Sequence, residues 1–287
     1  MEGSNPYLRP MALRDFLPFL GKPAPLVAVI RLDGVISARG RQTLSLANLA
    51  PQIRRAFSRK GLAAVALAIN SPGGAPAQSQ LIYSRIRQLA TEKNVPVLAF
   101  VEDVAASGGY WLALSGDEIF AEETSLVGSI GVITASFGFT DLIQRLGIER
   151  RVYTAGKNKS LLDPFRPESS EDVERLKAIQ QDMHDSFKEL VRARRGVRLS
   201  QEKDLFTGDI FTGRMALKYG LIDGIGDLRG IARRRFGDKV RLRVISPQRG
   251  WFRMRLPFLS RGHTTADIAA DLLAQIEERL AWSRFGL

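Results

Sequence analysis

The chain has 287 residues, of which 45% are hydrophobic and 25% are charged. This composition is typical of a globular protein that forms one large domain or two small ones. The absence of cysteine excludes disulfides, thiolate nucleophiles and cysteine-based metal sites. The two histidines, His184 and His263, are too few for a histidine-rich metal site, and neither follows a strand as the base of a Ser-His-Asp triad would.

The net charge is +12, and the excess is concentrated near the C-terminus. Residues 229–261 hold eleven Lys and Arg side chains against one acidic residue, Asp238, with aromatic residues interleaved from Trp251 to Leu259. This stretch fits a solvated face or peripheral contact with an anionic membrane, and we expect no nucleic-acid partner. No run approaches the roughly 20 apolar residues of a spanning helix, and no signal peptide is recognised. The sequence therefore predicts a cytoplasmic protein or one peripheral to the cytoplasmic membrane.

Strands and helices are predicted to alternate at short spacing after an N-terminal arm without strong periodicity. Continuous apolar runs predict buried strands, and apolar residues at helical spacing predict helices. The predicted strands are 26–32, 62–69 and 95–101, and the predicted helices are 44–60, 79–91, a helix beginning at 107, 171–195 and 265–285. Asp103 is interpreted as a turn or cap residue that ends the third strand.

This alternation predicts an α/β fold with mostly parallel sheets flanked by helices. We divide the chain into an N-terminal arm (1–25), a central domain (26–230), and a basic segment with a C-terminal amphipathic helix (231–287). Ligand chemistry in parallel sheets lies beyond the carboxyl ends of the strands. Two glycine-rich turns are expected at that edge.

Ser107 is the candidate nucleophile. It stands in Ala-Ala-Ser-Gly-Gly-Tyr at a predicted strand-to-helix turn, where small neighbours allow a substrate backbone to approach. Free N–H groups in the first turn of a helix can hold an oxyanion, and the Ser71–Gly74 turn offers a second set. Taken alone, the glycine content of both segments favours ordinary tight turns.

Several ordered motifs resemble the signal-peptide-peptidase-A/protease IV family of serine peptidases. These motifs are Asn70–Gly74, Ala105–Tyr110, Val127–Val132, Gly156–Ser160 with Asp163–Phe165, and Phe206–Arg214 with Gly220–Asp223. The resemblance covers roughly residues 26–230. It implies the crotonase/Clp-protease-like spiral, in agreement with the predicted alternation.

The resemblance also implies a Ser-Lys dyad. The family's nucleophile falls on Ser107 and its general base on Lys159, while Gly73 and Gly108 take the oxyanion-hole amides. Ser129 falls where the family has a hydroxyl that hydrogen-bonds the lysine. A serine needs a neighbour to take its proton, and lysine can do so only where its environment disfavours the charged form.

Lys157 is a rival base, because alternation in an extended segment points it the same way as Lys159. The Asp163–Pro167 turn is expected to hold the lysine loop in place. Half-length relatives form rings, so the dyad is expected to be shared between subunits of a homo-oligomer. No metal or organic cofactor is expected.

The leading hypothesis is an endopeptidase that cleaves unfolded or short peptides with apolar residues near the scissile bond, with signal-peptide remnants among its substrates. One alternative is an acyl-CoA hydratase or isomerase of the crotonase type, which would use carboxylates. Another is a catalytically inactive, membrane-associated scaffold.

Overall fold

The computed structural model describes residues 24–38, 40, 43–156, 158–246 and 279–286. An eight-stranded sheet forms its centre, with the order β6-β5-β3-β2-β1-β8 and with β4 between β3 and β7. The strands are β1 (Leu26–Asp33), β2 (Leu62–Ser71), β3 (Val97–Ala106), β4 (Glu118–Ala121), β5 (Leu126–Gly128), β6 (Ile210–Thr212), β7 (Gly224–Ile225) and β8 (Arg241–Val244). Every pairing is parallel except the antiparallel pair β5–β6. The predicted mostly parallel α/β fold is confirmed.

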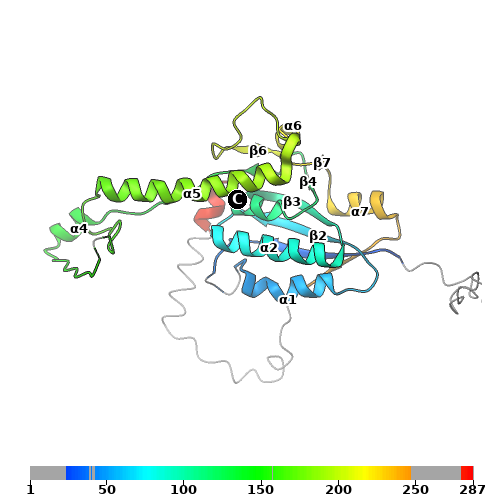
Figure 1. Ribbon diagram of the computed structural model, residues 1–287, viewed down its shortest axis with the longest axis horizontal. Helices are drawn as coiled ribbons and strands as arrows, with labels where there is room; N and C mark the ends of the chain where they lie inside the picture. The colour runs from blue at the N-terminus through cyan, green and yellow to red at the C-terminus, as the bar shows by residue number, and fades with distance from the viewer. Residues whose placement is uncertain (1–23, 39, 41–42, 157, 247–278, 287) are drawn as a thin grey trace, which may run out of the picture.

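Helices cover both faces of this sheet (Figure 1). They are α1 (Leu46–Phe57), α2 (Pro76–Lys93), α3 (Gly108–Ala113), α4 (Thr140–Arg145), α5 (Ser170–Arg195), α6 (Gly213–Lys218) and α7 (Leu228–Phe236), with a 3₁₀ turn at Gly196–Arg198. Local signals explain two of the starts, since the Ser45 hydroxyl accepts the Asn48 amide at the start of α1 and Pro76 opens α2.

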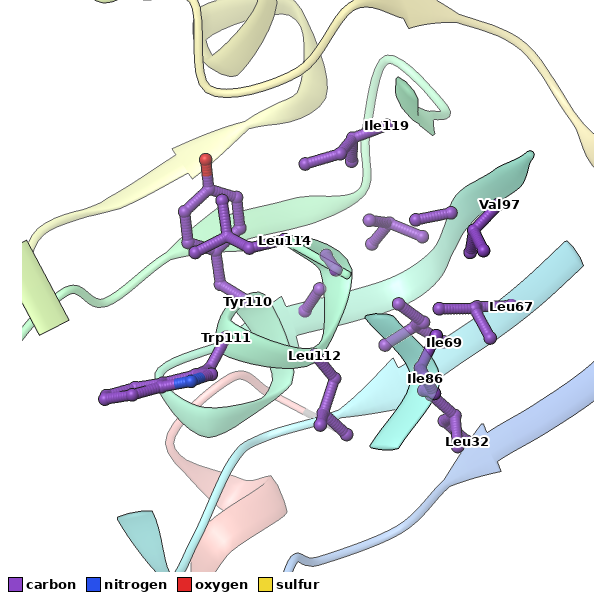
Figure 2. Close-up of a cluster of buried hydrophobic side chains, with 14 of the residues drawn as sticks. Leu32, Leu67, Ile69, Ile86, Val97, Tyr110, Trp111, Leu112, Leu114 and Ile119 are labelled. Atoms are coloured by element: carbon purple, nitrogen blue, oxygen red, sulfur yellow. The ribbon is translucent and has the colours of Figure 1, made fainter. Parts of the chain in front are cut away.

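The central strands are apolar at almost every position because both of their faces are buried. Side chains alternate between faces, so Ile30 and Leu67 contact the α1, α2, α3 and α5 side, while Val29 and Ala66 pack beneath α7. Two hydrophobic cores result, and the larger one contains Ile30 and Leu67. Figure 2 shows Tyr110, Trp111 and Leu112 of α3, whose side chains enter this larger core in different directions. This packing fixes α3, and with it the turn that precedes α3.

The third strand runs further than the sequence predicted. Asp103 does not end it, because the strand continues to Ala106 across an irregularity opposite Asn70. The Asn70 side-chain amide donates to Asp103 Oδ2 (3.2 Å), and its oxygen accepts the Val104 amide (3.2 Å). The polar side chains thus repair the irregularity instead of making a turn, and the strand delivers its last residue directly to Ser107.

Three regions of interest fall partly or wholly outside the described residues. The predicted N-terminal arm and the Trp251–Leu259 stretch lie outside them almost entirely. Of the predicted 265–285 helix, residues 279–283 are helical. Within the described part of the chain, no helix combines the length and the apolarity needed to cross a membrane.

Candidate active site

Ser107 occupies a strained turn between β3 and α3. Its φ of 51° and ψ of −119° are unusual for a residue with a side chain. Its amide donates to the Gly128 carbonyl (2.8 Å), and its carbonyl accepts the Trp111 amide (3.0 Å). Such strain persists only where the surroundings enforce it, and a serine on a sharp strand-to-helix turn is the geometry of a nucleophile elbow.

Gly73 and Gly108 lie together beside this serine. A Cβ placed on Gly73 would stand 2.9 Å from the Ser107 Cβ and 2.9 Å from the Gly108 amide nitrogen, so only glycine leaves this space open. The Gly108 amide belongs to the first turn of α3 and has no intrahelical acceptor. The Gly73 amide donates a long bond (3.2 Å) to Ser71 Oγ, which an oxyanion would have to displace.

Ser129 follows β5 at the same edge of the sheet. The register places Gly128 beside Ala106, so the turns after β3 and β5 are neighbours. Ser129 has a φ of 51°, and its amide donates to the Asp209 carbonyl (2.7 Å). Ser107 and Ser129 line one pocket.

That pocket has a volume of about 610 Å³ and collects segments distant in the sequence. Its lining residues are Val35, Pro72, Gly73, Gly74, Pro76, Ser107, Ser129, Gly131, Val132, Ile133, Thr207, Gly208, Ile210, Ala281, Arg284 and Phe285. None of these described lining residues is Asp or Glu, which disfavours the crotonase-type alternative with its catalytic carboxylates. The contribution of Ala281, Arg284 and Phe285 could not be read from the sequence.

Lys159 lies away from Ser107 in the same chain. It is exposed, its amide donates to the Gly156 carbonyl (3.2 Å), and it does not line the Ser107 pocket. Figure 1 shows α4 and the segment after it at the N-terminal end of α5, beyond the body of the molecule. We call residues 134–168 the α4 projection. The rival base, Lys157, lies outside the described residues.

Asp163 anchors the segment that carries Lys159. Its carboxylate accepts the Phe165 amide (3.1 Å) and the Arg150 Nε (2.9 Å). These hydrogen bonds, with that of the Phe165 amide contributing most, hold the pKa of Asp163 below its ordinary value. The Phe139 amide also donates to the Pro164 carbonyl (2.6 Å). The turn that was expected to hold the lysine loop therefore does contact the rest of the projection.

The His184 side chain contacts the backbone next to Ser129, and no sequence motif indicated this contact. Its Nε2 lies 3.1 Å from the Ile130 carbonyl, so α5 is tied to the residue after Ser129. His184 does not line the Ser107 pocket. Among the described residues, no cluster of three or more His, Asp or Glu side chains could hold a metal ion.

Comparison with known proteins decides the family. The model of peptidase family S49 matches residues 90–238. This range is more than half of the chain and includes both Ser107 and Lys159. The chain belongs to peptidase family S49. A chloroplastic serine protease SPPA of Arabidopsis thaliana is 34% identical over 207 residues, covering 71% of this chain and 30% of its own. Protease 4 of Haemophilus influenzae is 28% identical over 204 residues, covering 70% and 32%.

Two similar proteins have a name of a different kind. A Brucella abortus protein named Na(+)/H(+) antiporter NhaA is 52% identical over 271 residues, covering 91% of this chain and 37% of its own length. The chain thus spans about a third of the first curated relatives that it matches. The antiporter name belongs to a longer protein, of which the matched segment is 37%.

Proposed function

We propose that this S49 chain is a serine endopeptidase with Ser107 as nucleophile and Lys159 as general base. The observation that carries the proposal is the strained Ser107 turn, which faces an open pocket beside Gly73 and Gly108. The apolar lining residues, such as Val132 and Ile133, favour short or unfolded peptides with apolar side chains near the scissile bond. Signal-peptide remnants belong to this substrate class.

The proposed reaction is an acyl transfer through an acyl-enzyme at Ser107. Ser107 Oγ attacks the peptide carbonyl while the lysine amine takes its proton, and the oxyanion is held by the amides of Gly108 and Gly73. The lysine then gives the proton to the leaving amine. A water molecule, deprotonated by the same lysine, releases the acyl group from Ser107. The Ser129 hydroxyl orients the lysine in this scheme.

We further propose that the lysine reaches Ser107 from a second copy of the chain, in a ring of identical subunits. Two observations support this arrangement. Lys159 is exposed at a distance from its own Ser107 pocket. The α4 projection also exposes large apolar side chains: Phe137 is 79% exposed, Leu146 63% and Tyr153 90%. Apolar side chains gathered on a projection are typical of a surface that another protein covers.

Labelling with a fluorophosphonate tests the nucleophile. The wild-type protein should be labelled at Ser107, and Ser107→Ala should abolish both labelling and hydrolysis of a chromogenic peptide. Ser136→Ala, an exposed serine on the α4 projection, is the matched control and should leave both unchanged. Labelling and activity that survive in Ser107→Ala would refute the proposal.

The basic residues 229–261 are proposed to contact an anionic membrane. In the described part of this stretch, Arg229, Arg233 and Arg234 are exposed on α7, and Arg241 and Arg243 are exposed on β8. The protein should sediment with anionic liposomes, be released by about 0.5 M salt, and ignore neutral liposomes. Failure to sediment with anionic liposomes would leave these side chains as a solvated face.

A further inference from the structure

A second, much smaller cavity opens beside Ser107. Its volume is about 20 Å³. It is lined by Gly74, Pro76, Ser107, Gly108, Trp111, Gly131, Val132, Met183 and Phe187. Apart from the Ser107 hydroxyl, every side chain in this lining is apolar. A cavity needs about 10–15 Å³ to hold one water molecule, so this space suits a group of roughly methyl size.

The floor of this small cavity is rigid. The rings of Trp111 and Phe187 stack with centroids 4.6 Å apart, and their side chains are almost fully buried. The indole N–H of Trp111 donates to Gln80 Oε1 (3.0 Å), which fixes the ring. Neither ring can retreat without leaving the packed core, so a longer group cannot deepen the cavity from below.

Met183 forms the adjustable wall. It lies on α5 one turn before Phe187 and is 41% exposed, so its flexible side chain is free to move on the solvent side. The α5 backbone at this point is fixed, because the neighbouring His184 bonds the Ile130 carbonyl. The length of the side chain at position 183 is therefore the feature that sets how wide the cavity can become.

We propose that this cavity receives the substrate side chain on the acyl side of the scissile bond, that it accepts alanine-sized groups, and that Met183 sets the size limit. The inference rests on the proposed function. Ser107 attacks the carbonyl carbon, and the Cα that bears this side chain is bonded to that carbon. The cavity borders both Ser107 and Gly108, so it lies where a short side chain on that Cα would enter.

The test compares two peptides that differ only in Ala or Leu at this position. The wild type should prefer Ala by at least about 10-fold in kcat/KM, because one methylene in an apolar pocket changes discrimination by about 10-fold or more. Met183→Ala should raise kcat/KM for the Leu peptide about 10-fold and leave the Ala peptide within about threefold. Met183→Val should shift the ratio in the same direction by less.

Ile179→Ala is the matched control, since Ile179 is one turn earlier on α5, is 48% exposed and does not line the cavity. It should keep the wild-type ratio. Equal Ala/Leu ratios in the wild type and both Met183 variants would overturn the size limit, provided that fluorophosphonate still labels Ser107 in all of them. A wild type that is not labelled would overturn the proposed function and, with it, this inference.

Discussion

Two serines at the candidate site have an unusual backbone conformation. Ser107 and Ser129 both have a φ of 51°, and the two turns are joined by the hydrogen bond from the Ser107 amide to Gly128. The sequence placed Ser107 at the correct turn, because a buried strand and a small-residue helix start are visible as patterns. It could not predict the positive φ of either serine, since that conformation is imposed by hydrogen bonds to distant segments.

Gly73 gives a test of the space beside the nucleophile. Gly73→Ala should lower kcat by about 100-fold or more, because the new Cβ would collide with Ser107 and the Gly108 amide and displace the oxyanion donors. Gly61→Ala is the control: Gly61 has a comparable left-handed backbone, with φ of 69°, but nothing within 4 Å of its Cβ position. If Gly61→Ala were as inactive as Gly73→Ala, backbone strain and not the blocked space would be responsible.

The choice between the two lysines is tested at the same scale. Lys159→Ala should lose as much activity as Ser107→Ala, because residues that act as a unit contribute non-additively. Lys157→Ala should retain most activity, and it is the natural control because it stands two positions earlier. The measurement is kcat/KM on one peptide. An inactive Lys157→Ala variant beside an active Lys159→Ala variant would reverse the assignment.

A buried ion pair joins the end of α5 to the segment after α6. Arg195 is 3% exposed, and its guanidinium donates two hydrogen bonds to Asp223 (2.7 and 3.0 Å). Asp223 also accepts the Ile119 amide (2.8 Å), and buried Tyr110 donates to the Leu221 carbonyl (2.7 Å). This joint connects α5, which carries Met183 and His184, to the sheet edge beside α3.

Removing Asp223 should therefore cost more stability than removing a surface acid. Asp223→Ala leaves the buried Arg195 charge without its carboxylate, and we expect a loss of about 3–5 kcal/mol in the free energy of unfolding. Glu123→Ala breaks an exposed pair with Arg214 and should cost at most about 1 kcal/mol. Urea denaturation at pH 7 measures both. Equal costs would show that the buried pair does not hold the joint.

The pH dependence of the same pair has a definite sign. Burial alone would raise the pKa of Asp223, but the hydrogen bonds from Arg195 and the Ile119 amide outweigh burial and lower the pKa below its ordinary value. Because the folded pKa is lowered, ionised Asp223 stabilises the folded protein at pH values above its unfolded pKa of about 3.9. This stabilisation is lost as the pH falls through the folded pKa. The stability gap between wild type and Asp223→Ala should hold near pH 6 and narrow below about pH 4. A gap that widens in acid would contradict this.

Elements differed in how well the sequence predicted them. The long apolar strands β1 and β2 and the charge-laced helix α5 were predicted nearly residue by residue, because their periodicity extends over many positions. Strands of two to four residues, such as β5 and β7, were not predicted. A strand this short has too few positions to display a hydrophobic periodicity. The α4 projection was not predicted either. Its exposed apolar side chains do not line one buried face of an element, so they show no periodicity.

At the scale of the whole molecule, the site is divided. The proposed nucleophile Ser107 lines one pocket with Gly73 and Ser129, whereas Lys159, in the α4 projection, does not line that pocket. The resemblance supplied the pairing of Ser107 with Lys159. Their separation along the chain fits one molecule or two, and our proposal of two molecules rests on the exposure of Lys159 and its absence from the lining of the Ser107 pocket. In the proposed ring, heterologous contacts that close would let each subunit complete the site of one neighbour and have its own site completed by the other.

Mixing two inactive variants tests this account most directly. Ser107→Ala retains the lysine and Lys159→Ala retains the serine, so a ring assembled from both contains boundaries where an intact serine meets an intact lysine. With equal amounts, dissociated and reassembled together, about a quarter of the boundaries are productive on the premise of random closed contacts. We predict recovery of about a quarter of wild-type peptidase activity. Variants that exchange subunits freely yet remain inactive when mixed would contradict the claim that neighbouring chains complete the dyad.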